Sequence, residues 1–141
     1  MTDNNPYQQA SSAYQNIHET HMGGFDVVVE LYKGIIRNTE AAKTAYQNGE
    51  LEQMCKLNEK TTKILIALQS HLNHEQGGEA AAFLDSFYTG IFGQLMGVLR
   101  KEDPAAEFDQ VLEYLKPVYE MWCKHAANSA PKAAAPINAE T

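Results

Sequence analysis

Apolar side chains recur every three or four residues in four successive segments of this chain, and that spacing predicts helices with one buried face. In chain order, the segments cover residues 24–47, 50–72, 79–100 and 104–122. Turn signals separate them: Asn48-Gly49 favours a left-handed helix cap, and Asp103-Pro104 favours an N-cap followed by proline at the first helical position. Helices of about 20 residues joined by short turns predict an all-α, antiparallel up-and-down four-helix bundle.

The 141 residues are enough for one domain with its own hydrophobic core. We expect the bundle to span residues 21–127. Residues 1–20 are rich in Asn, Gln, Ser and Tyr, and we expect them to form an extended N-terminal arm. Residues 128–141 are a low-complexity Ala/Pro tail, and this composition predicts disorder.

The formal net charge of −7 gives the chain no attraction to phosphate backbones or anionic lipid, so we expect neither nucleic acid nor membrane insertion. No segment approaches the ~18 apolar residues that a membrane-spanning helix needs. The polar N-terminus lacks the basic and apolar regions of a signal peptide. The chain is therefore expected to be cytoplasmic, with Cys55 and Cys123 as buried free thiols.

The third segment carries more apolar surface than one buried face can use, because it has no charged residue between Ser86 and Leu99. At 100° per residue, its core side is formed by Leu84, Tyr88, Ile91, Leu95 and Val98. Outside that stripe lie the apolar side chains and glycines Phe83, Phe92, Met96, Leu99, Gly90, Gly93 and Gly97. Glycines on one strip leave room for a second backbone, so we expect a partner helix to dock there.

Other apolar residues outside the buried stripes are expected to widen this face, namely Phe25, Val29, Ile36 and Ile66. Two alternatives to a partner helix remain open. A second copy of the chain could cover the face, which would make the protein a self-associating structural bundle. The N-terminal arm could also cover it.

Helical bundles often hold metal pairs, so a ferritin-like, metal-binding bundle is a further alternative. That site needs Glu-x-x-His on two helices, and no glutamate here precedes a histidine by three residues. The pairs His18/His21 and His71/His74 are interpreted as surface histidines. No phosphate-binding loop or nucleophile elbow is found. We expect a non-enzyme with no catalytic residues, no metal and no cofactor.

Several stretches of the chain resemble the flagellin export chaperones, the FliS family. The most specific is Glu75-Gln76-Gly77-Gly78-Glu79, at the start of the third helical segment. The others are Ala13-Tyr14 in the arm, the segment from Glu30 to Ile36, and the stretch from Asp103-Pro104 to Trp122. Together they cover residues 13–125. The chain departs from the family pattern at Met22-Gly23-Gly24, which replaces Ser-Pro-Glu, and at Gly93-Gln94, which replaces two arginines.

The resemblance implies a small cytosolic chaperone that binds the disordered C-terminal segment of flagellin. That segment would fold into helices on the chaperone, which would prevent premature polymerisation. The complex would then be handed to a gate component of the flagellar type III export apparatus, with the arm taking part in covering the groove and in docking. When free, the chain is expected to be a monomer or a weak dimer. The expected partner-binding residues are Tyr14, Ile17, Phe83, Phe87, Gly90, Phe92, Gly93, Met96, Gly97 and Leu99.

Overall fold

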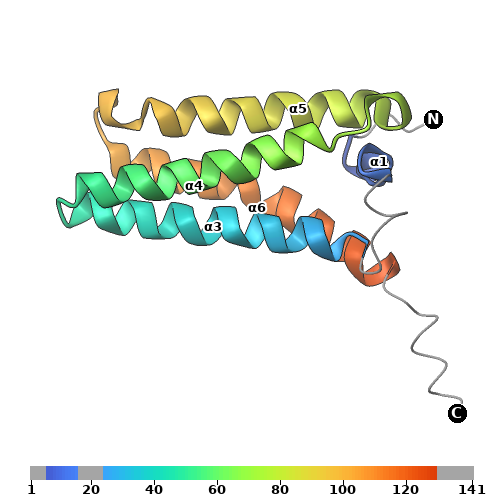
Figure 1. Cartoon of the computed structure of the whole chain (residues 1–141), viewed down its shortest axis with the longest axis horizontal. Coiled ribbons are helices and arrows are strands. Elements are labelled where there is room, and N and C mark those ends of the chain that lie inside the picture. Colours follow the sequence, from blue (N-terminus) through green and yellow to red (C-terminus); the bar gives the residue numbers. More distant parts are fainter. Residues whose placement is uncertain (1–5, 16–23, 130–141) are drawn as a thin grey trace, which may run out of the picture.

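A computed structural model describes residues 6–15 and 24–129 of the chain. Its four long helices run antiparallel to their neighbours in sequence and form an up-and-down bundle (Figure 1). In order, the elements are α1 (Pro6–Ala13), α3 (Asp26–Gln47), α4 (Leu51–Ser70), α5 (His74–Met96), the 3-10 turn η1 (Val98–Arg100) and α6 (Pro104–Ser129). The described residues contain no strand, and the expected all-α bundle is confirmed.

The core lies where the inward faces of the four long helices meet. Its largest fully buried side chains are Tyr14, Tyr32, Ile35, Met54, Leu65, Leu68, Leu84, Tyr88, Ile91, Leu95, Phe108 and Trp122. Burying a large apolar side chain stabilises the fold by roughly 1.5–3 kcal/mol relative to leaving it in water. Most of these residues belong to the three-and-four spacing of the sequence, so the apolar pattern is the main cause of the fold.

Local signals place the ends of the helices. Gly49 adopts φ +77°, and the N–H groups of Gly49 and Glu50 donate to the carbonyls of Tyr46 and Ala45 over 3.0 and 2.8 Å. This pair of bonds is a Schellman motif, and it turns the chain from α3 into α4. At the start of α6, the carboxylate of Asp103 accepts a hydrogen bond from the backbone N–H of Ala106 over 3.2 Å. The expected glycine cap and N-cap are therefore both present.

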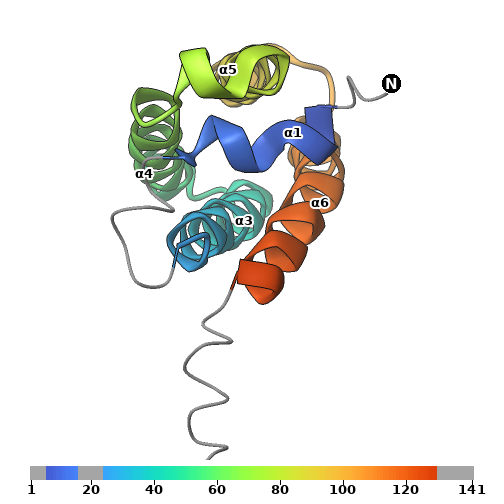
Figure 2. The ribbon, with the colours of Figure 1, turned by 90° about the vertical axis from the view of Figure 1, so that its right-hand side faces the viewer.

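The N-terminal arm is not extended where the structure describes it, since residues Pro6–Ala13 form helix α1. Proline suits the first position of a helix, and one side of α1 is buried, with Ala10 and Ala13 at 1% and 0% exposure. Figure 2 looks along the bundle and shows α1 crossing its end, between α5 and α3. An eight-residue helix is marginal by itself, so tertiary packing stabilises α1. Residues 16–20 of the arm lie outside the described part, as do His18, His21 and the Met22-Gly23 hinge.

Helix α5 begins at His74 rather than near residue 79 because Asn73 caps it: the Asn73 Oδ1 accepts from the N–H of Gln76 over 2.8 Å. The helical dihedrals break once, at Gly78, where φ is +50° and ψ is −124°. The α-helix then ends at Met96, and η1 completes the segment that the sequence predicted as one helix. At the other terminus, α6 continues to Ser129, two residues into the expected tail; residues 130–141 lie outside the described part.

The motif Glu75–Glu79 holds α1 against α5. The backbone N–H of Asn73 donates to the carbonyl of Ala13 over 2.7 Å, next to Gly77. A Cβ on Gly77 would lie 2.6 Å from the Cα of Ala13, closer than real Cβ atoms approach backbone. Gly77 is therefore required for the close contact between the backbone of α5 and that of Ala13, and Gly78 for the turn beside it. The side chains of Glu75, Gln76 and Glu79 are exposed.

None of the helices in the described residues is long and apolar enough to cross a membrane.

Replacing Gly77 by alanine should destabilise the protein by about 1–3 kcal/mol, because the added methyl overlaps the backbone of α1. The matched control is Gly90→Ala, where a Cβ meets nothing within 4 Å. That change should stabilise the protein by up to about 1 kcal/mol, because alanine favours a helix interior. Urea unfolding of both variants measures the difference. Equal stability of the two variants would show that α1 does not pack on Gly77 in solution.

Candidate functional site

Tyr14 is completely buried, although the sequence pointed to it as a partner-binding residue. Its hydroxyl donates to the carbonyl of Leu68 over 2.7 Å. This carbonyl is one of the last four of α4, which have no hydrogen-bond donor within the helix. The same hydroxyl lies 2.9 Å from that of Tyr88, which in turn lies 2.8 Å from that of Tyr32. This chain of three tyrosines joins the end of α1 to α3, α4 and α5 in the interior. Ile17 lies outside the described residues.

Burial raises the pKa of Tyr14 well above its usual value, and the nearby Tyr32 adds to the rise. Burial likewise raises the pKa of Tyr88, with further contributions from Tyr32 and Tyr14. Both phenols are therefore neutral in the folded protein throughout the physiological range. Their hydrogen-bonded chain belongs to the core of the protein and is not a titrating site near neutral pH.

The outward side of α5 is apolar and accessible. Phe92 and Met96 are 40% and 46% exposed and lie one turn apart on α5, and Leu99, in the η1 turn that follows, is 47% exposed; we call these three side chains the apolar line. Gly90 and Gly93 are also exposed, and a Cβ on either would meet nothing within 4 Å. Five of the ten expected partner-binding residues are thus brought together on one open face.

Other expected residues are less accessible. Phe83 and Phe87 are half-buried, pack against the core, and stack on each other with ring centroids 6.0 Å apart. Gly97 is buried at the end of α5. The expectation that Phe25 and Val29 widen the exposed face is wrong, because they are only 4% and 8% exposed. Phe25 packs on Trp122 with ring centroids 5.6 Å apart, so it belongs to the core.

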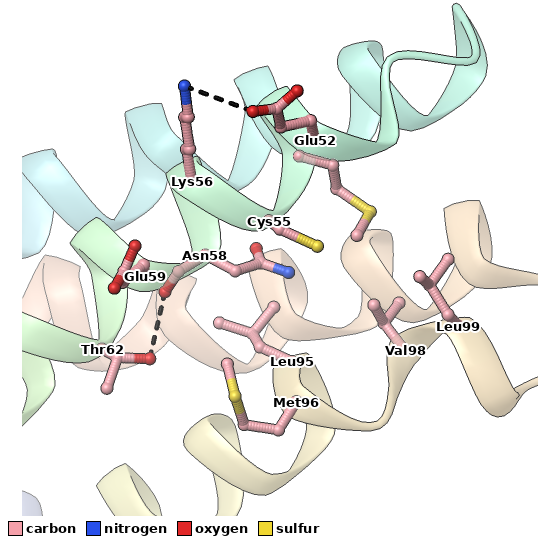
Figure 3. A pocket seen from close by; sticks show the side chains of 11 residues that line it. Glu52, Cys55, Lys56, Asn58, Glu59, Thr62, Leu95, Met96, Val98 and Leu99 are labelled. Atoms are coloured by element: carbon pink, nitrogen blue, oxygen red, sulfur yellow. Dashed lines mark hydrogen bonds and ion pairs between the residues drawn. The ribbon is translucent and has the colours of Figure 1, made fainter.

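A hollow of about 430 Å³ lies between α4 and the C-terminal part of α5 (Figure 3). Its mainly apolar wall includes Met54, Cys55 and Asn58 from α4 and Leu95, Met96 and Leu99 from α5 and the following turn. The hollow continues the line of exposed apolar side chains on α5. Cys55 is exposed here rather than buried as expected, whereas Cys123 is half-buried. Ile66 of α4 is 57% exposed, in agreement with its expected contribution to the surface.

The hollow was not predicted, because its shape depends on the spacing between two helices. A signal for it was nevertheless present in the sequence. Asn58, which lines the hollow, interrupts the apolar stripe of α4, and a polar group in such a stripe needs a partner.

The other side of α5 is polar. A cleft of about 540 Å³ between α5 and α6 is lined by Gly93, Gln94, Gly97, Arg100, Lys101, Glu107 and Gln110. The Gln94 Nε2 donates to Glu107 Oε1 over 3.0 Å and to Gln110 Oε1 over 2.8 Å. The strip of Gly90, Gly93 and Gly97 therefore separates an apolar side of α5, which lies toward α4, from an amide-rich side, which lies toward α6. No group of three or more potential metal ligands gathers among the residues that the structure describes.

The buried tyrosines predict a loss of stability at alkaline pH. Because their pKa values are higher in the folded than in the unfolded chain, the stability that the neutral phenols contribute is complete below about pH 10 and decreases as the pH rises beyond it. Tyr14→Phe should lower stability at pH 7 by about 1–3 kcal/mol, since the Leu68 carbonyl loses its donor.

Above pH 10, the same variant should lose stability less steeply than the wild type, because one buried phenol is gone. Urea unfolding between pH 7 and 11 provides the comparison. Parallel pH profiles for the two proteins would mean that Tyr14 is not buried in solution.

Comparison with known proteins agrees with these features. The family model described as "Flagellar protein FliS" matches residues 4–129. The chain is 31% identical over 118 residues to the "Flagellar secretion chaperone FliS" of Campylobacter jejuni subsp. jejuni serotype O:6, covering 81% of this chain and 91% of that protein. It is 30% identical over 96 residues to the protein of the same description from Vibrio cholerae serotype O1, covering 68% of this chain and 70% of that protein. A match over almost the whole described chain, on an all-helical bundle that begins α5 with Glu-Gln-Gly-Gly-Glu, shows that the chain belongs to the FliS family.

Proposed function

We propose that this chain is a cytoplasmic flagellar secretion chaperone that binds the C-terminal helical segment of flagellin. Two relatives described as flagellar secretion chaperones support the general role. The observation that carries the binding site is the open apolar line of Phe92, Met96 and Leu99 on a stretch without charged side chains. Exposed apolar surface of this kind is typical of a protein-binding site.

The spacing of this line suits a helical client. Phe92 and Met96, four residues apart on α5, present their side chains to one neighbouring helix, which is how an amphipathic helix is held in a groove, and Leu99 follows them in η1. Gly90 and Gly93 lie beside the line and add no side chains, so a client backbone can approach closely. The hollow between α4 and α5 then offers a pocket for a client side chain at the far end of the line.

The chaperone action follows from the same burial. A client segment that polymerises through its apolar side cannot do so while that side is packed on α5. Coupled folding and binding commonly buries about 1,000–3,000 Å² and spends several kcal/mol on ordering the client. Binding of this type is specific and reversible without nucleotide. A component of the flagellar type III export gate could therefore release the flagellin segment simply by competing for its binding. We propose that the N-terminal arm, including Tyr14 and Ile17, takes part in docking at that gate.

In the described structure, Tyr14 cannot contact a gate component directly because it is buried beneath α1. Its side chain would become available only if α1 left the bundle, which would break the bonds to Leu68 and Tyr88. Packing of the arm on the bundle and contact with a partner through Tyr14 are therefore mutually exclusive.

Phe92→Glu should weaken binding of the flagellin C-terminal segment by at least about 30-fold, because it places a charge on the apolar contact surface. Tyr114→Glu is the matched control, since Tyr114 is a similarly exposed aromatic residue (46%) on α6. It should bind the segment as the wild type does. Isothermal titration calorimetry with flagellin from the same bacterium measures both affinities, and thermal melting checks that both variants fold.

Two results would count against the proposal in different ways. Failure of the wild-type chain to bind the flagellin segment would contradict the chaperone role. If both Phe92→Glu and Tyr114→Glu weaken binding of the segment equally, or if neither variant weakens it, the client binds elsewhere on the bundle.

A further inference from the structure

Two adjacent cations, Arg100 and Lys101, follow α5 in a chain whose net charge is −7. Both are exposed, and both line the cleft of about 540 Å³ between α5 and α6. The ion pairs among the described residues are made by Lys33, Lys43 and Lys56, so neither of the two cations has a carboxylate partner there. The cleft therefore presents two positive charges that the described part of the chain does not neutralise.

The absence of a side chain at Gly97 makes room for the guanidinium of Arg100. The Nη2 of Arg100 lies 3.0 Å, and its Cζ 3.7 Å, from the point that a Cβ on Gly97 would occupy. The guanidinium thus folds back over the end of α5, where the last carbonyls of the helix carry a partial negative charge. In this position it borders the cleft, and its outward N–H groups are accessible to a ligand.

The other polar side chains of the cleft bind one another. Gln94 donates to Glu107 and to Gln110, so the single acidic residue of the lining is already engaged by an amide. Two cations against one acid give the lining a positive net charge, although the chain as a whole is acidic. The cleft therefore suits a ligand with negatively charged acceptor oxygens.

The cleft adjoins the apolar line. Gly97 belongs to its lining, Met96 precedes Gly97 directly, and Leu99 is followed by Arg100. A helix that packs on the apolar line can therefore place one of its ends at the cleft. The C-terminal end is the one that fits, because the last carbonyls of a helix lack donors and a free α-carboxylate adds a full negative charge.

We propose that Arg100, supported by Lys101, binds the terminal α-carboxylate of the client. A guanidinium offers two parallel N–H groups that match the two oxygens of a carboxylate. This inference rests on the proposed function and adds the direction and register of the bound segment. The client helix ends at η1, with its apolar side on Phe92 and Met96, so the chaperone recognises the end of the client chain as well as its apolar face.

The chain's own C-terminal carboxylate is poorly placed for this cleft. The cleft lies at the start of α6, and the 26 residues of α6 span about 39 Å before the helix ends at Ser129 (Figure 1). The twelve residues that follow would have to return over this distance, and they reach at most about 43 Å when fully extended. A second copy of the chain would bring another net charge of −7 close to the first, which opposes association.

The test uses two synthetic forms of the flagellin C-terminal segment, one that ends in the free carboxylate and one that ends in an uncharged carboxamide. Isothermal titration calorimetry measures the affinity of each form for the full chain. The wild type should bind the amidated form at least about 10-fold more weakly than the free acid. Arg100→Gln should bind the free acid at least about 10-fold more weakly than the wild type does, and should distinguish the two forms by less than about threefold.

Arg37→Gln is the matched control, because Arg37 is the other arginine of the chain and the substitution changes the net charge by the same amount. Arg37 is exposed on α3, makes no ion pair among the described residues, and lines neither the hollow nor the cleft. This variant should bind both forms of the segment as the wild type does. Thermal melting checks that both variants fold.

Several outcomes would overturn the inference and leave the proposed function intact. They are equal affinity of the wild type for the two forms, undiminished discrimination between the forms by Arg100→Gln, and equal effects of Arg100→Gln and Arg37→Gln. Tighter binding of the free acid after truncation at Ser129 would assign the cleft to the chain's own carboxylate. A dimer of the wild type that Arg100→Gln dissociates, as measured by light scattering, would assign it to a second copy. Either result would also overturn the inference, whereas failure of the wild type to bind both forms would contradict the proposed function itself.

Discussion

The burial of the inward face of α5 is the interaction on which both surfaces of this helix depend. Leu84, Tyr88, Ile91 and Leu95 are at most 2% exposed and fix the rotation of α5 about its own axis. With that rotation fixed, Phe92 and Met96 must point away from the core. The stability of the fold therefore does not require the outward residues to be apolar. The packing of the bundle therefore does not account for the apolar character of Phe92 and Met96.

Much of the fold could be predicted because it follows from local signals and apolar spacing. Gly49 and the Asp103-Pro104 pair cap helices as expected. Helix α1 could not be predicted in the same way, since its eight residues show no long apolar period and it is stabilised by contact with α5. The motif around Gly77 was recognised by resemblance, but its cause is a contact with Ala13, more than 60 residues away in sequence.

The accessibility of the proposed client-binding residues could be predicted only in part. The exposure of Phe92 and Met96 follows from their angular position on α5, which sequence defines, whereas Leu99 lies in η1 beyond the end of that helix. The burial of Tyr14 depends on two hydroxyl contacts with distant helices, and sequence periodicity carries no information about them. The hollow beside Asn58 depends on the distance between α4 and α5. Sequence periodicity predicts the angular position of a residue on one helix, but it does not predict the distances and contacts between helices.

Trp122, the single tryptophan of the chain, lies against the side chain that ties α1 to the bundle. Its ring centroid is 5.3 Å from that of Tyr14 in an edge-on arrangement, and its Nε1 is buried without a partner among the described residues. Departure of α1 would admit water to this indole and shift its fluorescence to longer wavelength. Client binding on the outward face of α5 would leave the indole covered. The protein thus contains an intrinsic optical probe that distinguishes release of the arm from occupation of the proposed client surface.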